Sequence, residues 1–222
     1  IGGEFEYSIV KTNQGKLIIA TALVDNVMKE AGIEEYETIK TLSGEELEGV
    51  LCKHPFLDRT SRVVLGSDDT IVVELGTGTG AVHTAPGYGK EDYLCGLKNG
   101  LEIVVTVDGK GYQTEGAGIF AGLKYDESND KIIEWLEENK FLLKKQKINH
   151  SYPHCWRCKN PIIFRATEQW FCSVDKFKDE AIKAAETVKW IPSWGADRIS
   201  NMIKERADWC ISRQRTWGVP LP

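Results

Sequence analysis

Alternating apolar and polar residues near the start of the chain predict a β-hairpin. The segments 5–10 and 16–20 are rich in β-branched residues, and the Asn-Gln-Gly sequence at 13–15 between them tolerates a tight turn. Apolar residues then recur at helical spacing after Thr21, a residue type that caps helices, as far as Gly32, a residue type that ends them. A hairpin followed by an amphipathic helix is therefore the expected beginning of the fold.

The same periodicities predict most of the remaining elements. Runs of β-branched residues indicate strands, and apolar residues three or four apart indicate helices. The predicted strands cover residues 62–65, 70–75, 101–107 and 141–143, and the predicted helices cover residues 131–139, 174–188 and 196–207, with a further helix start at Lys90. Glycine recurs too densely between 108 and 122 for a helix, so we expect a loop there. The predicted fold class is α+β, a β-rich body with inserted and C-terminal helices.

Charge is distributed unevenly along this chain. Its 222 residues carry 28 Lys and Arg against 33 Asp and Glu, a net charge of −5. Residues 1–143 hold 13 basic against 25 acidic residues, and residues 144–222 hold 15 against 8. A basic C-terminal third offers one face to a polyanion such as RNA, with solvated lysine-rich helix faces as the alternative explanation. A hydrophobic fraction of 41% excludes a disordered or collagen-like chain.

The cysteines and the two ends of the sequence allow predictions about the compartment of the protein and about its full length. Six cysteines, of which only Cys155 and Cys158 are close together, suit a reducing compartment better than a disulfide framework. No apolar run reaches the length of about 18 residues that a membrane-spanning helix needs. We therefore expect a cytoplasmic monomer with no membrane partner. The start at Ile1 and the extended last residues predict a fragment of a longer protein.

The segment 76–93 holds the densest candidate chemistry. Alternating Gly and Thr after a strand brings backbone amides and hydroxyls close to a ligand, and His83 and Asp92 flank a Pro-Gly loop that can bring them to one pocket. The glycine spacing matches no dinucleotide fingerprint, and no Walker lysine follows. From the residues alone, a turn-rich loop with a core histidine is the better explanation of this segment.

Two further motifs lie in the basic third. Cys155 and Cys158 form C-x-x-C, the usual half of a tetrahedral zinc site. No second cysteine pair completes it, and a site of two cysteines and two histidines would need His150 or His154 to fold back. The segment 209–218 interleaves tryptophans with Arg213 and Arg215, a pattern that stacks on bases or binds phosphates, or that packs aromatic rings at the end of a helix.

Taken together, three motifs resemble one family. They are G-T-G-A-V-H-T-A-P-G-x-G-x-E-D-Y at 78–93, S-Y-P-H-C-W-R-C-K-x-P-I-I-F-R-A-T-E-Q-W-F at 151–171 and D-W-C-I-S-R-Q-R-x-W-G-V-P at 208–220. The chain resembles isoleucyl-tRNA synthetase over almost its whole length, with the valyl enzyme second and the leucyl enzyme third. The resemblance implies an editing domain centred on a small β-barrel over 1–146, with 147–222 returning toward the class I catalytic fold.

The resemblance also implies a function and a site. The family's editing domain hydrolyses valyl-tRNA(Ile), and valyl-adenylate is a further expected substrate. Asp92 matches the residue that anchors the substrate's α-ammonium, and His83 matches the one that excludes isoleucine. The candidate editing residues are Asp92, His83, Thr79 and Thr84, with Gly78 and Gly80 for backbone contacts to substrate and with Arg213, Arg215 and Trp217 for tRNA. Isoleucine tRNA and the rest of the synthetase chain are the expected partners.

Departures from the family pattern limit these expectations. The family's Thr-rich loop lies upstream of Glu4 and is absent from this sequence, so the predicted site lacks one wall. Tyr88 stands where the family more often has histidine. Editing needs no cofactor, and without the HIGH and KMSKS signatures ATP and Mg belong to the absent catalytic domain. In the intact enzyme, Cys155 and Cys158 are expected to hold zinc with a second cysteine pair. The alternatives are the editing domain of a valyl enzyme and a non-catalytic tRNA-docking fragment.

Overall fold

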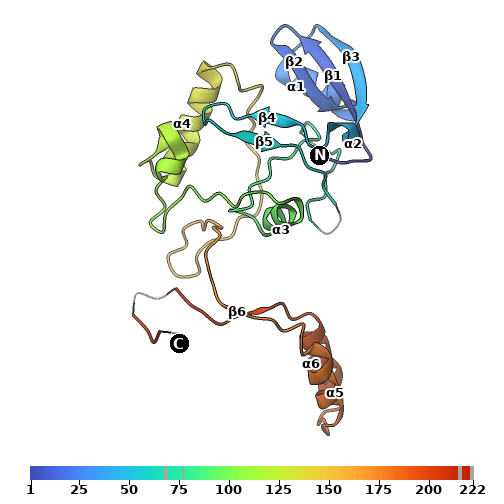
Figure 1. The fold of residues 1–222 in the computed structure, drawn as a ribbon, viewed down its shortest axis with the longest axis vertical. Helices are drawn as coiled ribbons and strands as arrows, with labels where there is room; N and C mark the ends of the chain where they lie inside the picture. The colour runs from blue at the N-terminus through green and yellow to red at the C-terminus, as the bar shows by residue number, and fades with distance from the viewer. Residues whose placement is uncertain (68–69, 77, 215–216, 221–222) are drawn as a thin grey trace. The chain divides into compact units, whose positions relative to one another are not determined.

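The computed structural model describes residues 1–67, 70–76, 78–214 and 217–220 of the chain, drawn as a ribbon in Figure 1. It divides into two compact units, Ile1–Ala166 and Thr167–Pro222. This division of contacts does not test the domain boundary expected after residue 146, which stays a prediction about the complete enzyme. No helix in the described ranges is long and apolar enough to cross a membrane.

The N-terminal sheet of the first unit has the strand order β2-β1-β3 and is antiparallel throughout. Its strands are β1 (Glu6–Thr12), β2 (Gly15–Ala20) and β3 (Tyr36–Ser43), which are the blue strands of Figure 1. The predicted hairpin is thus confirmed. The short 3₁₀ helix η1 (Thr21–Leu23) leads into α1 (Val24–Ala31), whose C-cap Gly32 is left-handed at φ 72°, as predicted.

One hydrophobic core joins this sheet to α1. The apolar face of the helix buries Val24, Val27 and Met28 against the sheet. Tyr7, Val10 and Ile19 are among the sheet residues of this core, each at most 1% exposed. The first 47 residues therefore form one packed platform of sheet and helix, and the segments that follow are anchored on it.

The rest of the first unit is built from short elements joined by long irregular segments. These elements are α2 (Gly44–Leu47), β4 (Leu51–Lys53), β5 (Thr60–Arg62), α3 (Lys90–Asn99), the 3₁₀ helix η2 (Glu115–Phe120) and α4 (Tyr125–Glu138). β4 and β5 form an antiparallel two-stranded sheet. The helix start predicted at Lys90 is confirmed, and α4 begins six residues before the predicted 131.

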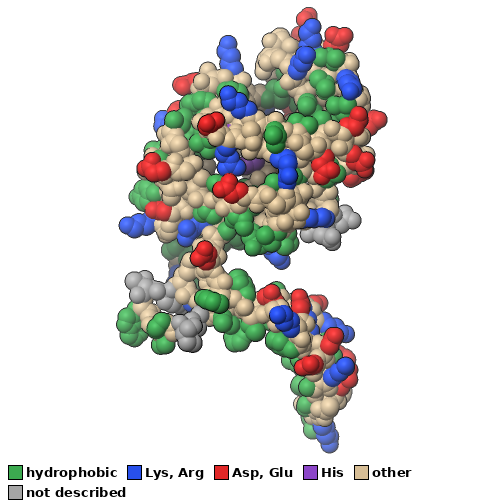
Figure 2. Space-filling model, viewed as in Figure 1, with side chains coloured by type: hydrophobic (Ala, Val, Ile, Leu, Met, Phe, Trp, Pro, Cys, Tyr) green, Lys and Arg blue, Asp and Glu red, His purple; other side chains and the backbone are tan. Residues whose placement is uncertain are grey.

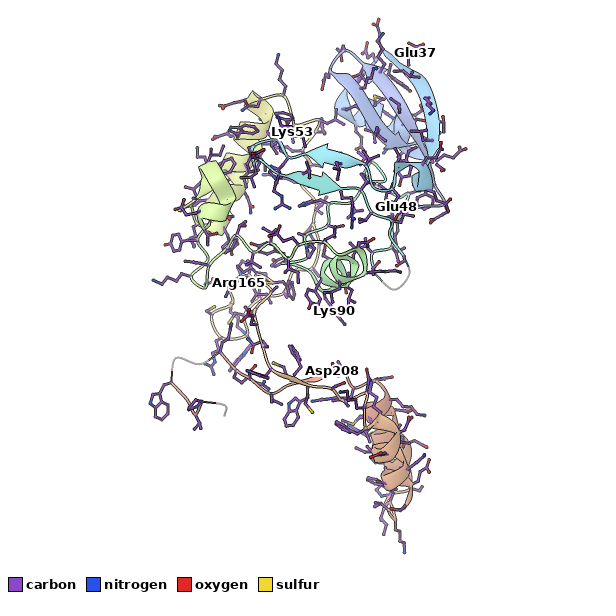
Figure 3. All side chains as sticks on the ribbon, in the orientation of Figure 1. Glu37, Glu48, Lys53, Lys90, Arg165 and Asp208 are labelled. Atoms are coloured by element: carbon purple, nitrogen blue, oxygen red, sulfur yellow. The ribbon has the colours of Figure 1, made fainter. Side chains whose placement is uncertain are left out.

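The second unit is a helical hairpin carried by a two-stranded sheet. α5 (Lys178–Glu186) packs against α6 (Gly195–Lys204), so both predicted helices are confirmed in shortened form. β6 (Phe171–Cys172) pairs with β7 (Trp209–Cys210) where the two ends of the hairpin meet. Asp208, labelled in Figure 3, accepts a 3.0 Å hydrogen bond from Val174 N and holds the hairpin's two ends together.

Several strand predictions were wrong. Residues 70–75, 101–107 and 141–143 contain no strand within the described ranges, and the strand expected at 62–65 is β5, at Thr60–Arg62. Irregular partners bind backbone groups of these segments instead: Thr70 N donates to Ser67 O, and Val107 N donates to the Tyr88 hydroxyl. β3 was missed because its first six residues are all exposed, which leaves no apolar alternation to detect.

The described residues form three separate sheets and no closed barrel. The protein is therefore a mixed α and β structure, as predicted at the coarser level, and the barrel-centred editing fold belongs to the proposal made below. Strand propensity without a neighbouring strand cannot close a barrel, because closure requires every edge to be paired.

Candidate functional site

The Gly-Thr segment is tied to the N-terminal sheet. Ala20 N donates to Thr79 O at 2.9 Å, and the Tyr7 hydroxyl donates to Gly80 O at 2.7 Å while accepting from Gly2 N at 3.0 Å. Gly80 has φ 77°, and a Cβ there would lie 2.4 Å from the Cβ of Ala20. Glycine is favoured at this left-handed position because a side chain would collide with Ala20. The core of the sheet thereby fixes where the next residues, including His83, leave the platform.

Asp92 links the other end of this loop to α3. It lies in the first turn of the helix, and its Oδ1 accepts from Ala85 N at 2.9 Å. Pro86 packs against Gly96 of the same helix, where a Cβ would come within 2.8 Å of the proline ring. A carboxylate near a helix N-terminus is also favoured by the helix dipole. Residues 85–92 are therefore a tight corner in which Asp92 holds the loop to the helix.

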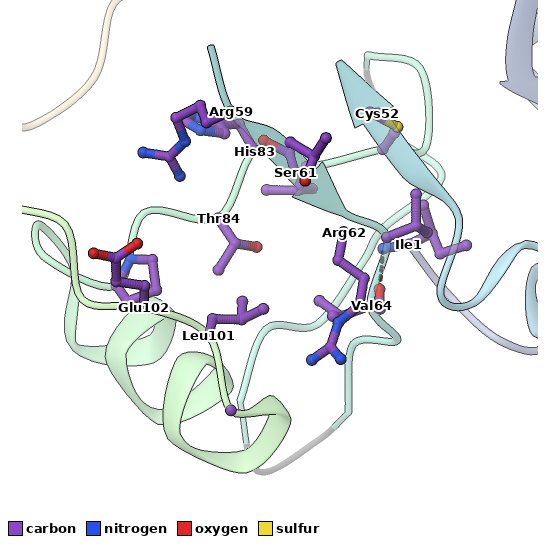
Figure 4. A pocket seen from close by; sticks show the side chains of 16 residues that line it. Ile1, Cys52, Arg59, Ser61, Arg62, Val64, His83, Thr84, Leu101 and Glu102 are labelled. Atoms are coloured by element: carbon purple, nitrogen blue, oxygen red, sulfur yellow. Dashed lines mark hydrogen bonds between the residues drawn. The ribbon is translucent and has the colours of Figure 1, made fainter. Parts of the chain in front are cut away.

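Two adjoining hollows lie beside this corner. The larger, which we call the groove, has a volume of about 670 Å³ and runs between β5 and the loop after α3 (Figure 4). The smaller, which we call the histidine cavity, has a volume of about 210 Å³. They share the wall residues Arg59, Ser61, His83, Thr84, Pro86 and Glu102. These shared residues form a junction through which one ligand can occupy both hollows.

The groove has opposite charges at its rim. In Figure 4, Arg59 and Glu102 flank one end, Thr84 projects between them, and Arg62 and Ile1 lie at the other end. Among the described residues, neither Arg59 nor Glu102 belongs to an ion pair. A histidine is visible inside the hollow on the face of Figure 2, with basic and acidic side chains around it. This groove suits an elongated polar ligand.

The histidine cavity is mostly apolar. Its apolar walls are Phe56, Leu57, Val104, Ala117, Phe120 and Ile132. Polar side chains, among them His54, His83 and Gln113, lie between these apolar walls, and pockets that combine apolar walls with polar groups are typical of small-molecule sites. One of them, Gln113, donates through Nε2 to Ser128 Oγ at 3.0 Å, while its buried Oε1 has no hydrogen-bond partner among the described residues. The cavity thus combines apolar walls with several polar side chains in a small volume.

The Tyr88 hydroxyl organises one wall of the cavity. It accepts hydrogen bonds from Thr106 N at 2.8 Å and Val107 N at 3.0 Å, and it lies 3.0 Å from Thr106 Oγ1. Next to it, a Cβ on Gly87 would lie 2.3 Å from Val104 O. The segment 104–107 is therefore clamped against the loop that carries His83.

His54 is a site residue that the sequence analysis missed. It lines the histidine cavity, and its Nδ1 accepts from Leu57 N at 3.1 Å and Phe56 N at 3.3 Å. Burial, followed by the nearby charges of Arg59 and His83, lowers the pKa of His54 from its ordinary value. The only sequence signal was a histidine in the turn between two short strands, which by itself does not distinguish a structural from a functional residue.

The structure brings together only part of the predicted editing site. His83 and Thr84 line both hollows. Asp92, Thr79, Gly78 and Gly80 line neither of them, since Asp92 bonds to Ala85 and the Gly-Thr segment lies against the sheet. His54, Arg59 and Glu102 join the site from segments that the sequence analysis had not singled out.

Cys155 and Cys158 lie on one tight turn. Cys155 N donates to Asn160 O and Lys159 N donates to Cys155 O, both at 2.8 Å. Backbone amides of Cys158 and Arg157 that point at the sulfur lower the pKa of the Cys155 thiol. This is suitable chemistry for half of a zinc site, but no group of three or more metal-binding side chains occurs in the described ranges. Two cysteines cannot close a tetrahedral site without ligands from elsewhere.

The predicted tRNA-binding residues lie in the second unit. Trp217 is 93% exposed and Trp209 53%, so the first side chain is almost uncovered by the described parts of the chain and the second is about half covered. The Arg213 guanidinium donates to Cys210 O and Ser212 O of its own segment. Arg215 lies outside the described residues. The exposed rings fit a contact surface better than the alternative of a packed helix end.

Comparisons with known proteins agree on one family. The family model for class I tRNA synthetases (I, L, M and V) matches residues 5–222. The isoleucine–tRNA ligase of Caldicellulosiruptor bescii is 54% identical over all 222 residues, which are 24% of that protein. That of Caldicellulosiruptor saccharolyticus is 56% identical over 219 residues, and that of Moorella thermoacetica 51%, in each case over 23% of the relative. The chain thus spans about a quarter of the length of the curated relatives it matches.

Proposed function

This chain belongs to the class I tRNA synthetases, and on that premise we propose that it is the editing region of an isoleucine–tRNA ligase. Its proposed reaction is the hydrolysis of valyl-tRNA(Ile), with valyl-adenylate as a second substrate. The observation that carries the proposal is His83 at the junction of the small histidine cavity and the larger groove. The barrel-centred editing fold of the complete enzyme is part of the same proposal.

The need for such a site is physical. One methylene in an apolar pocket is worth only about 1–3 kcal/mol, a limit for which isoleucine against valine is the standard example. An aminoacylation site shaped for isoleucine therefore also accepts valine, and a second, smaller site must hydrolyse the valyl product. A cavity of about 210 Å³ with apolar walls is of the right kind for a short aliphatic side chain.

Each hollow has a proposed role in binding the ester. The valyl side chain occupies the histidine cavity, and the ribose and adenine of the terminal nucleotide follow the groove. The ester then lies at the junction, where His83 limits the size of the acyl group and Thr84 offers a hydroxyl for the attacking water. Asp92 lines neither hollow, and its proposed role as the anchor of the α-ammonium rests on the family resemblance and on its hydrogen bond to Ala85 N in the loop that carries Thr84.

The decisive experiment is deacylation of valyl-tRNA(Ile) by the intact synthetase and its Asp92 variants. Asp92→Asn retains an acceptor for Ala85 N but removes the charge, whereas Asp92→Ala removes both. A hydrogen bond to a charged group contributes about 1.5–3 kcal/mol, so we expect about 10- to 150-fold slower hydrolysis in Asp92→Asn with an unchanged melting temperature. Isoleucyl-tRNA(Ile) serves as the control substrate. Wild-type rates in Asp92→Asn would exclude Asp92 as the anchor.

A second function, tRNA docking, is favoured by the exposed rings of Trp209 and Trp217 beside Arg213. Tryptophan rings stack on bases and arginines bind phosphates. Substituting Arg213 and Arg215 by alanine should weaken tRNA binding and reduce its salt dependence, because fewer counterions are released. A salt slope equal to that of the wild type would show that these arginines do not contact phosphate.

The remaining assignments concern the complete enzyme. We propose isoleucine tRNA and the rest of the synthetase chain as partners, a cytoplasmic location and a monomeric state. ATP and Mg belong to the catalytic domain, and zinc to Cys155 and Cys158 together with ligands from outside this chain. The editing domain of a valyl enzyme is less favoured, because the relatives compared above are isoleucine–tRNA ligases.

A further inference from the structure

His54 is held in one orientation by its own turn. Its Nδ1 accepts hydrogen bonds from the amides of Phe56 and Leu57, and its backbone N donates to Arg59 O at 3.0 Å. The Phe56 ring packs edge-on against the imidazole, with centroids 4.5 Å apart. A ring fixed by two hydrogen bonds and one aromatic contact cannot rotate freely.

This fixation also selects one tautomer of the imidazole. A nitrogen that accepts two amide hydrogen bonds carries no proton, so the ring's hydrogen is on Nε2. Protonation of Nδ1 would break both bonds and place a cation beside Arg59. Burial and the neighbouring charges lower the pKa of His54, which agrees with a neutral ring at neutral pH. Nε2–H is then a fixed donor with no acceptor among the described residues.

The position of His54 is next to the junction of the two hollows. His54 lines the histidine cavity, and both groups whose charges act on it, Arg59 and His83, line the cavity and the groove. Tyr88, another polar wall residue, is unavailable to a ligand, because its hydroxyl already bonds to Thr106 and Val107. A fixed neutral donor beside the place of the ester is the arrangement that stabilises a developing oxyanion.

We propose that Nε2–H of His54 donates a hydrogen bond to the carbonyl oxygen of the aminoacyl ester and stabilises the oxyanion formed during editing. This inference rests on the proposed editing function. Water adds to the carbonyl carbon, and the π-electron pair moves to the oxygen that faces His54. The tetrahedral intermediate then collapses, the bond to the ribose oxygen breaks, and that oxygen takes the proton lost by the water. His54 remains neutral throughout and transfers no proton.

The test uses two variants of the intact synthetase that separate the two nitrogens of the ring. His54→Asn keeps an acceptor at the position of Nδ1 for the turn but has no donor at the position of Nε2. His54→Gln places an amide donor near Nε2 and loses the acceptor of the turn. Single-turnover deacylation of valyl-tRNA(Ile), thermal melting and hydrogen exchange of the Phe56 and Leu57 amides are measured for both.

Removal of one oxyanion donor slows catalysis by about 10²- to 10³-fold in a well-studied hydrolase. We therefore expect a loss of this size in the rate constant of His54→Asn, with binding of the substrate and protection of the turn unchanged. His54→Gln should recover at least about tenfold over His54→Asn, in line with a partly restored donor. A purely structural role gives the reverse order, with His54→Asn close to wild type, and overturns the inference, as does an equal loss in both variants. If the wild-type enzyme itself does not hydrolyse valyl-tRNA(Ile), the proposed function fails instead.

Discussion

Tyr88→Phe removes a single oxygen that satisfies two backbone amides at the candidate site. In the wild type, Thr106 N and Val107 N donate to this hydroxyl at 2.8 and 3.0 Å. Phenylalanine keeps the ring and its packing, so the substitution tests the hydrogen bonds alone. Both amides lie in a partly buried segment that forms one wall of the histidine cavity.

The expected cost follows from the loss of an acceptor without the loss of its donors. A donor left unsatisfied costs about 1–3 kcal/mol, and partial burial lets water replace some of that interaction. We expect about 1–3 kcal/mol in total for the two amides, which corresponds to about 5- to 150-fold faster local opening. Because the loosened segment 104–107 lies against the loop of His83, deacylation by the intact enzyme should slow as well.

Hydrogen exchange measured by mass spectrometry on peptides covering 101–110 reports this opening directly. Tyr93→Phe is the matched control, since Tyr93 is 37% exposed and its hydroxyl makes no hydrogen bond within the described ranges. Faster exchange in Tyr88→Phe but not in Tyr93→Phe is the expected result. Unchanged exchange at 106 and 107 would refute the reasoning, because it would mean that the hydroxyl does not hold this segment.

Three other predictions concern separate features. Gly80→Ala should destabilise the first unit by more than Gly78→Ala in urea unfolding, because both glycines have positive φ but only at Gly80 would the Cβ collide with Ala20. The αL strain common to both costs about 1 kcal/mol, and equal losses would contradict the packing argument. Folding lowers the pKa of His54, so below a pH of about 6.5 the unfolded chain takes up a proton that the folded chain does not. The free energy of unfolding should therefore be unaffected by this group above that pH and decrease below it. Unfolding measured from pH 5 to 8 should show a weaker fall in His54→Gln, and an identical fall would assign the effect to other groups. Zinc titration should give weak binding through Cys155 and Cys158, and stoichiometric zinc that resists chelators would disprove the half-site.

Local chemistry made part of the candidate site predictable. A Gly-Thr segment that ends at His83 and Thr84 carries its signal in consecutive residues, and both side chains do line the two hollows. Asp92 was also singled out, but its bond to Ala85 N depends on the way the loop turns back onto α3. The spacing of residues along the chain does not predict how the loop turns back onto the helix.

The contribution of His54 was not predictable, for a physical reason. Its neutral tautomer depends on two amides of its own turn, and its place beside His83 depends on contacts between segments about 30 residues apart in the sequence. Neither the tautomer nor the place beside His83 produces a periodic pattern in the sequence. The same holds for Tyr88, whose partners Thr106 and Val107 were expected to lie in a regular strand.

By itself, the sequence determined the elements that depend on neighbouring residues: the hairpin of β1 and β2, α1 with its glycine end, and the helices of the second unit. These are set by side-chain periodicity and turn residues, which act over a few positions. Only the tertiary structure decided whether residues 70–75 and 101–107 would pair as strands, because a strand needs a partner and here the backbone bonds went to loops and side chains. It also decided which polar groups meet at the junction, since long-range packing sets that distance and local propensity does not.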